Sequence, residues 1–352
     1  MSAVVATGSA VNARARSPNQ RAWARFKRNR IGYVSLWIFL AMLFVATFAE
    51  FISNDRPLVA KYEGHWYFPV FDNPPEVTFG GDFHTPTDWT DPLIVERFSR
   101  PGNWALRTLN PHSANSLDYF QKPPNPAPPG ERRLLGTDEV GRDLLARLIY
   151  GFRVSIYFAL ALTVFGTALG VLMGALQGYF GGRLDLSVQR LIEVWNSIPE
   201  LYLLIIFASI FAPSLLLLLV LLSLWGWIGL SDYVRAEFLR NRNLEFVKAA
   251  RALGLSNWQI VWRHVLPNSM TPVITFLPFR MSGAILALTS LDFLGLGVPA
   301  SVPSLGDLLR QGKNNLDSWW IIVPTFVLLV VTMALLTFIG DALRDAFDTR
   351  KS

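Results

Sequence analysis

The sequence predicts an all-α membrane protein with six transmembrane helices. The chain has 352 residues, 51% of them hydrophobic, and the apolar residues are clustered in long runs. No Asp, Glu, Lys or Arg occurs in residues 31–49, 154–182, 201–231 or 318–340. Each run has roughly the 20 residues that a helix needs to cross a hydrocarbon layer of about 30 Å.

The first 30 residues form a basic tail, which carries seven Lys or Arg residues and no acid. An excess of basic residues before a span marks the cytoplasmic side. We interpret residues 31–52 as the first transmembrane helix, not as a cleaved signal peptide, because the run is long and no small-residue cleavage pattern follows it.

Residues 53–135 are polar, aromatic and rich in proline, and none of their apolar runs is long enough to span a membrane. We predict a periplasmic insertion that follows the first helix. Disordered segments are poor in aromatic residues, so the composition favours a small folded cap. The stretch Pro123–Gly130 is expected to act as a stiff spacer back to the membrane.

Residues 136–352 are predicted to hold the other five spans. The apolar stretch Leu186–Leu230 is too long for one helix, and Pro213 breaks it into spans three and four. In span two, glycine recurs every fourth residue, which places the glycines on one helix face where another helix can approach closely. We favour static packing there over a sliding contact. The predicted spans two, five and six are Arg153–Gly178, Pro272–Leu291 and Trp319–Gly340, and the glycines are Gly166, Gly170, Gly174 and Gly178.

Six crossings place both termini in the cytoplasm, together with the segment between spans four and five. Basic residues outnumber acidic ones in that segment, which is a second and independent indication of the same orientation. The net charge of +6 lies largely beside apolar runs, so we expect no nucleic-acid partner.

The cytoplasmic segment predicts a helix-turn-helix. Gly254 can end the first helix and Ser256 can cap the second. In the second helix Trp258, Val261, Trp262 and Val265 are spaced i, i+3, i+4 and i+7, so they form one apolar face. Such a helix can lie on lipid headgroups, pack under its own bundle or enter a groove of a partner. The small residues Ala249, Ala250 and Ala252 favour docking on a partner protein, because small side chains let another backbone approach closely.

Several kinds of chemistry are excluded by the residue pattern. The only Gly-Lys pair is Gly312-Lys313, followed by Asn314, so a phosphate-binding loop is absent and the chain is not expected to bind or hydrolyse ATP. There is no cysteine, and the four histidines are scattered along the chain. We therefore predict no catalytic residue, no cofactor and no metal ligand in this chain.

Two stretches, Ala249-Ala-Arg-Ala-Leu-Gly254 and Arg263-His-Val-Leu-Pro-Asn268, resemble the cytoplasmic EAA loop of permease subunits in bacterial ABC importers for dipeptides and oligopeptides. Lys248 stands where that motif usually has Glu, and Glu245 is the nearest acidic substitute. Stretches 135–143, 294–299 and 340–348 resemble the same family. The insertion from Tyr62, with stretches 193–195 and 312–316, is similar to Yej-type permeases, which serve importers of oligopeptides and the peptide antibiotic microcin C.

The resemblance implies an inner-membrane subunit that forms half of a peptide pathway. Its expected partners are a second homologous permease subunit, an ABC ATPase with two nucleotide-binding domains that hold ATP and Mg, and a periplasmic peptide-binding protein. The residues that the resemblance places against the ATPase are Glu245, Lys248, Ala249, Ala250, Gly254, Leu266 and Pro267.

Charged residues inside spans mark candidates for the translocation path, because an ionised side chain in mid-bilayer costs roughly 2.5 to 3.5 kcal/mol. Span three carries Glu193, Asn196 and Glu200 at i, i+3 and i+7, and Pro199 can kink it. Glu193 can instead pair with Arg190. The remaining candidates are Arg280 and Asp292 in span five.

Two roles are open for Arg280, a structural ion pair with Glu200 or a contact with a peptide carboxylate. Two other classes of function also remain open. A proton-coupled secondary peptide transporter would use Glu200 and Arg280 as its relay. A membrane-anchored receptor would act through the aromatic insertion.

Overall fold

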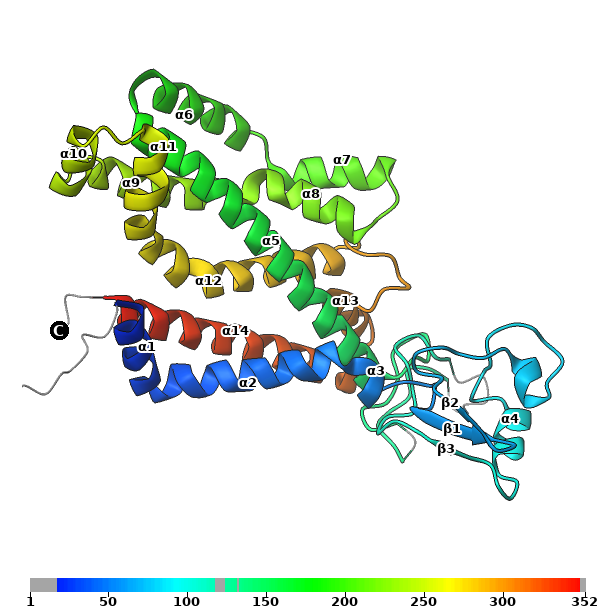
Figure 1. The fold of residues 1–352 in the computed structure, drawn as a ribbon. Helices are drawn as coiled ribbons and strands as arrows, with labels where there is room; N and C mark the ends of the chain where they lie inside the picture. Colours follow the sequence, from blue (N-terminus) through cyan, green and yellow to red (C-terminus); the bar gives the residue numbers. More distant parts are fainter. Residues whose placement is uncertain (1–17, 118–123, 132, 349–352) are drawn as a thin grey trace, which may run out of the picture.

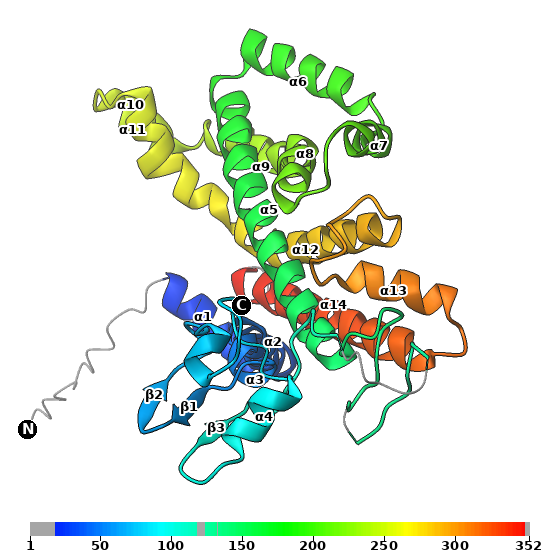
Figure 2. The ribbon, with the colours of Figure 1, turned by 90° about the vertical axis from the view of Figure 1, so that its right-hand side faces the viewer.

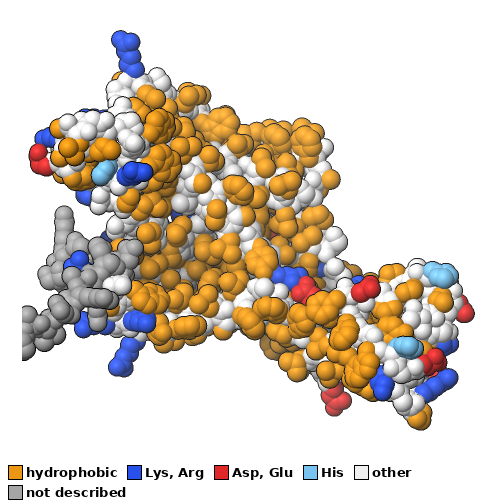
Figure 3. All heavy atoms as spheres, viewed as in Figure 1, with side chains coloured by type: hydrophobic (Ala, Val, Ile, Leu, Met, Phe, Trp, Pro, Cys, Tyr) orange, Lys and Arg blue, Asp and Glu red, His pale blue; other side chains and the backbone are white. Residues whose placement is uncertain are grey.

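The computed structural model describes residues 18–117, 124–131 and 133–348. Long helices form a bundle, and a small domain with strands lies at one end of it (Figure 1). We call this the insertion end. The opposite end, which we call the hairpin end, holds α1, the last turns of α14, and α10 and α11 (Figure 1). The side chains between the two ends are mostly hydrophobic on the face in Figure 3, and charged ones gather at the ends.

The chain begins with α1 (Pro18–Arg28), α2 (Arg30–Thr47) and the short α3 (Ala49–Ile52). Part of the basic tail is therefore a helix. Its Phe26 is buried against Ala342 and Ala346 of α14 (Trp319–Phe347). Asn29 caps α2 by accepting a hydrogen bond from the Gly32 backbone N–H at 3.1 Å. These contacts attach the first span to the last one.

The insertion is folded, as its aromatic content predicts. Its antiparallel sheet has the order β2-β1-β3, in which Ala60 pairs with Tyr67 on one side and with Ala105 on the other. Ala60 is buried with Phe79, Trp89 and Ile94 in a small core of its own. The elements are β1 (Val59–Tyr62), β2 (His65–Tyr67), η1 (Glu76–Phe79), α4 (Pro92–Phe98) and β3 (Trp104–Leu106).

Helix α5 (Leu144–Phe180), 37 residues long, runs through the middle of the bundle (Figures 1 and 2). It contacts α2, α8 (Leu215–Gly226), α9 (Ile228–Asn241) and α12 (Leu266–Phe293). α13 (Leu305–Asn314) packs between α12 and α14 at the insertion end. The large apolar core lies among α5, α12 and α14 and includes Ile156, Ile285 and Leu336.

The glycine face of α5 is confirmed as a packing surface. A Cβ atom at Gly174 would lie 2.5 Å from the Ser231 carbonyl oxygen, and one at Gly178 would lie 2.5 Å from the Phe238 Cβ. Both neighbours belong to α9. Gly166 and Gly170 face the junction of α8 and α9 in the same way. The missing side chains let two helix backbones touch, which larger residues would prevent.

The third span differs from the prediction of one helix. Residues 182–210 form α6 (Gly182–Asn196) and α7 (Glu200–Ile210), which are bent by 64° relative to each other. Pro199 explains the break, because proline disfavours helical geometry in the residue before it. Five helices in the described part of the chain are long and apolar enough to cross a membrane, and the bent pair makes six if it counts as one span.

The hairpin consists of α10 (Glu245–Ala252), α11 (Asn257–Ile260) and a π-helical segment, η2 (Val261–Val265), which leads directly into α12. The predicted caps are confirmed: Gly254 is left-handed with φ of 79°, and Ser256 forms a capping box with Gln259. The prediction of a separate second helix is wrong. Residues 257–293 form one continuous helix of 37 residues, so span five begins well before Pro272.

Candidate functional site

An open cavity of about 280 Å³ lies in the side of the bundle. Its walls come from α5, from the consecutive helices α7 and α8, and from α12. Two charged residues of opposite sign line it, Glu200 on α7 and Arg280 on α12. The rest of the wall is made largely of apolar and small side chains, such as Leu162, Gly283 and Ala287.

Glu200 and Arg280 share the cavity but do not pair. The Arg280 Nη2 donates a hydrogen bond of 2.7 Å to the carbonyl oxygen of Gly226 at the end of α8. Its Nε has no hydrogen-bond partner among the described residues. The Glu200 carboxylate is half-buried and likewise has no partner in the part of the chain that is described. Of the two roles left open for Arg280, the structural ion pair with Glu200 is therefore not formed.

Two more polar atoms at this cavity lack partners. The hydroxyl of Thr163 on α5 and the indole Nε1 of Trp225 on α8 are both buried, and neither bonds to any described residue. Most buried polar groups in folded proteins are hydrogen-bonded. The cavity thus gathers polar groups that the protein itself leaves unsatisfied.

Glu193 and Asn196 lie elsewhere. Both are exposed residues of α6, and the bend at Pro199 separates them from Glu200. The polar stripe predicted along span three therefore does not continue to Glu200, since helical spacing holds only within one straight helix. Glu193 forms the alternative contact, an ion pair of 2.5 Å with Arg190.

Asp292 also lies outside the cavity, near the insertion end of α12. Its carboxylate accepts hydrogen bonds from the Val298 backbone N–H at 2.8 Å and from the Ser304 hydroxyl. Gly297 and Gly306 pack directly against it. Asp292 therefore holds the loop that joins α12 to α13, which includes the stretch 294–299 singled out in the sequence.

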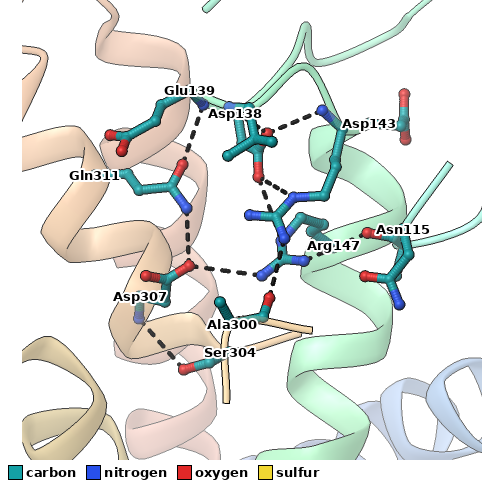
Figure 4. Close-up of polar contacts among 12 residues, drawn as sticks. Asn115, Asp138, Glu139, Asp143, Arg147, Ala300, Ser304, Asp307 and Gln311 are labelled. Carbon is teal, nitrogen blue, oxygen red and sulfur yellow. Dashed lines mark hydrogen bonds and ion pairs between the residues drawn. The ribbon is translucent and has the colours of Figure 1, made fainter. Parts of the chain in front are cut away.

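A buried polar network at the insertion end, which the sequence did not predict, centres on Arg147 of α5 (Figure 4). The side chain of Arg147 is fully buried, and it lies 3.5 Å from a carboxylate oxygen of Asp138 and 3.6 Å from one of Asp307. Asp138 also pairs with Arg142 at 2.7 Å. Two arginines and two aspartates are thus enclosed together, a balance of charge that lowers the cost of burial.

The network joins segments that are distant in the sequence. Arg142 donates to the Ala300 carbonyl in the loop after α12, and Arg147 donates to the Ala114 carbonyl in the insertion. Gln311 of α13 bridges Asp307 and the backbone N–H of Glu139 (Figure 4). The network therefore ties the insertion, the start of α5 and α13 to one another.

Asp143 is the residue from which the burial of Arg147 could have been predicted. This residue directly precedes an apolar run, and its side chain caps α5 by accepting from the Ala146 backbone N–H at 2.8 Å. Recognised as a helix cap, it places the start of α5 at Leu144 and puts Arg147 in the first turn of a buried helix. The apolar pattern alone places the start of this span at Arg153, well after its actual start at Leu144.

At the hairpin end, one face of the hairpin packs on its own bundle. Val247, Ala250, Val261 and Val265 are buried in a cluster that includes Phe238 of α9. The predicted apolar face of the second helix is only half confirmed, because the two valines are buried while the two tryptophans are exposed. The large exposed side chains here are Leu253, Trp258 and Trp262.

The residues predicted to contact an ATPase divide between these two faces. Glu245 and Lys248 form an exposed ion pair of 2.8 Å. Ala249, Gly254 and Pro267 are also exposed. Ala250 is buried against the bundle and Leu266 is half-buried, so these two residues support the hairpin from inside.

α6 is attached to the hairpin end by a second ion pair that the sequence did not predict. Arg235 of α9 binds Asp185 of α6 through two parallel contacts of 2.5 and 2.7 Å. This bidentate geometry is the strong form of an arginine–carboxylate pair. The contact holds α6 beside α9, close to the segment that carries the hairpin.

A bundle of membrane-spanning helices, with a charged cavity in its side and a shaped hairpin at one end, defines a membrane transport subunit. Residues 166–352 match the model of the binding-protein-dependent transport system inner membrane component. Residues 17–69 match the N-terminal transmembrane domain of oligopeptide transport permease C. The chain belongs to the family of binding-protein-dependent transport system inner membrane components, the permease subunits of ABC transporters.

Bacterial permease proteins are similar to this chain over nearly its whole length. The chain is 47% identical to the inner membrane ABC transporter permease protein YejE of Escherichia coli, covering 95% of this chain and 98% of that protein. It is 46% identical to the peptidoglycan transport system permease protein YejE of Agrobacterium fabrum, covering 95% and 93%. The dipeptide transport system permease protein DppC of Lactococcus lactis is 31% identical, covering 95% and 91%. The resemblance to Yej-type permeases is confirmed, which sets aside the secondary-transporter and receptor alternatives.

Proposed function

We propose that this chain forms half of a pathway that carries peptides across the inner membrane, driven by ATP hydrolysis in partner subunits. The other half comes from a second, homologous permease subunit. A periplasmic peptide-binding protein delivers the substrate, and an ABC ATPase with two nucleotide-binding domains supplies ATP and Mg chemistry. The relatives named for dipeptide and peptidoglycan transport support a peptide-bearing substrate. By its Yej-type resemblance the substrate class includes oligopeptides and microcin C.

The observation that carries the proposal is the continuity of the hairpin with α12. Leu253 at the turn is 82% exposed, whereas Trp258 and Trp262 are partly exposed at a groove beside Phe180 of α5. An exposed apolar residue at the tip is what a hairpin that binds a partner's groove needs. The same helix continues from Trp258 through α12 to Arg280 in the cavity wall. A partner that moves the hairpin therefore moves one wall of the cavity directly.

The orientation of the subunit follows from the same proposal. The hairpin, α1 and the last turns of α14 lie at one end of the bundle (Figure 1). The hairpin needs a cytoplasmic partner. The basic residues of the tail and hairpin agree, because loops rich in Lys and Arg remain in the cytoplasm. The insertion and α13 then face the periplasm.

Cysteine cross-linking tests the coupling, because the chain contains no cysteine of its own. In the assembled transporter, Leu253→Cys is expected to form a cross-link to the ATPase when a reagent with one maleimide and one succinimidyl ester is added, because it joins the thiol to a lysine amine of the partner. Val164→Cys, which is also exposed in this subunit but lies in the middle of α5, is the control and should not reach the ATPase. If Leu253→Cys in the complex is labelled by a monofunctional maleimide but is never cross-linked to the ATPase, the proposal is contradicted.

The orientation is tested with a maleimide that cannot cross membranes. Phe71→Cys in the insertion, exposed in the structure, should be labelled in intact spheroplasts. Leu253→Cys should be labelled only after the membrane is permeabilised, in a strain without the ATPase so that the hairpin is accessible. The reverse pattern would place the hairpin outside and rule out its coupling role.

A further inference from the structure

The cavity between α5, α7, α8 and α12 contains two opposite charges that the protein keeps apart. A buried charge is costly unless a partner or water compensates it. Elsewhere in this chain arginines meet their carboxylates directly, as Arg235 meets Asp185 with two contacts of 2.5 and 2.7 Å. Glu200 and Arg280 do not, although both line the same 280 Å³ space. A purely structural role gives no reason for this separation.

Arg280 is held in place without a carboxylate partner. Its Nη2 is bound to the Gly226 carbonyl at 2.7 Å, which fixes the guanidinium group against α8. Gly166 makes room for it, since a Cβ atom there would lie 2.6 Å from the Nη2. The Nε remains without a partner among the described residues. The arginine is thus oriented in advance and keeps a donor free.

The unsatisfied groups define the chemistry of an occupant. The Arg280 Nε and the Trp225 Nε1 can only donate hydrogen bonds, whereas the Glu200 carboxylate can only accept them. The Thr163 hydroxyl, whose residue is 5% exposed, can do either. An occupant that satisfies all four needs an acceptor with negative charge at one end and a donor with positive charge at the other. The cavity itself is neutral in sum, so a zwitterion matches it.

The remaining wall and the size of the cavity narrow the class of ligand further. Gly283, Ala284 and Ala287 provide a smooth surface without side-chain polar groups, so the wall selects no particular side chain. A volume of 280 Å³ is at the lower limit of pockets for drug-sized ligands, about 300 to 1,000 Å³. It suits a dipeptide or one end of a longer peptide.

We propose that this cavity is a peptide-terminus subsite within the permease itself. Arg280 and Trp225 bind the terminal carboxylate of a short unblocked peptide, and Glu200 binds its terminal ammonium group. The inference rests on the proposed function, because it assumes that peptides pass through this subunit. It adds to that function a selection for free termini that occurs after the binding protein has released the substrate.

The test measures peptide binding to the purified transporter in nanodiscs, without the periplasmic binding protein. Radiolabelled alanylalanine is displaced by unlabelled alanylalanine, by its N-acetyl derivative or by its C-terminal amide. Each blocked peptide is expected to compete about tenfold to a hundredfold more weakly, since each loses a charge-assisted hydrogen bond in a buried site. No binding of alanylalanine, or equal competition by all three peptides, would overturn the proposal.

Variants assign each terminus to its residue. Arg280→Gln should abolish the discrimination against the amide while keeping that against the acetylated peptide. Glu200→Gln should have the opposite pattern. Ser282→Ala, on the same helix but outside the cavity lining, is the matched control and should discriminate as the parent does. These ratios are measured within each variant, so a moderate loss of folded protein does not change them.

ATP-driven uptake of the same peptides separates the two proposals. If uptake by the intact transporter proceeds and Arg280→Gln and Glu200→Gln leave its peptide preference unchanged, the subsite is refuted and the proposed function stands. If the purified chain neither associates with an ATPase nor supports uptake, the proposed function fails first.

Discussion

Charged side chains lie inside the bundle in two regions, and the two regions treat them differently. At the insertion end, Arg147 is enclosed by Asp138 and Asp307, which come from different segments. In the cavity, Arg280 is bound only to the Gly226 carbonyl, and neither Arg280 nor Glu200 forms an ion pair with any described residue. A buried charge with its counter-charge fixes a structure, whereas a buried charge without one leaves a site that a ligand can complete. The first region therefore holds the subunit together, and the second is available for transport.

The strongest test of this contrast removes the central cation of the network. Arg147→Leu should lower the free energy of unfolding by about 3 to 5 kcal/mol, because it leaves Asp138 and Asp307 buried without their common partner. Thermal unfolding of the purified subunit in detergent measures the loss. Arg310→Gln is the control, since Arg310 contacts Asp307 from an exposed position and should have little effect. Equal losses in both variants would contradict a structural role for the network.

A second substitution crowds the side chain of Arg280 in the cavity wall. Gly166→Ala places a methyl group against Arg280 Nη2 and the Gly226 carbonyl. Overpacking of this kind costs about 1 to 3 kcal/mol, and we expect peptide binding to weaken as Arg280 is displaced. Gly229→Ala, where nothing lies within 4 Å of the added Cβ, should change neither stability nor binding. Unaltered binding in Gly166→Ala would show that the position of Arg280 is unimportant.

Neutralising the cavity carboxylate sharpens the comparison. Glu200→Gln should leave the free energy of unfolding unchanged or slightly higher, within about 0.5 kcal/mol, because no ion pair is lost and the cost of burying a charge is removed. Asp138→Asn, the same chemical change in the network, should be clearly destabilising. Chemical or thermal unfolding of the two variants side by side gives the answer. A large loss in Glu200→Gln would reveal a hidden structural partner.

The smallest effect on stability is expected at the hairpin surface. Leu253 is 82% exposed, and substitutions at such positions usually change stability by less than about 0.5 kcal/mol. Leu253→Ser should therefore unfold like the parent subunit, yet the amount of ATPase that copurifies with it should decrease. Retention of the full amount would indicate that the partner binds another face.

The parts of the fold that depend on local chemistry could be predicted from the sequence. Long apolar runs located the spans, the four-residue glycine spacing located the face of α5 that contacts α9, and Gly254 and Ser256 marked the turn of the hairpin. Each of these signals acts within a few helical turns. The resemblance of the hairpin to a family motif supplied the function.

The parts of the fold and of the site that depend on contacts between distant residues could not be predicted from the sequence. The helix period through Glu193, Asn196 and Glu200 assumed a straight helix, and the 64° bend at Pro199 invalidates it. The pairing of Arg147 with Asp307 joins residues that lie far apart in the sequence, so no local pattern indicates it. Glu200 and Arg280 were singled out from the sequence as costly charges, and the packing of α7, α8 and α12 shows that they line one cavity.

The π-helical segment Val261–Val265 sits between the hairpin turn and α12. Each of its backbone bonds closes over five residues and not over the usual four, so the segment stores one surplus residue within an otherwise α-helical rod. Tightening it to α geometry would turn the tryptophan-bearing end about the axis of α12 without unwinding either part. A pull on the hairpin would thereby reach Arg280 as a twist of α12 as well as a displacement.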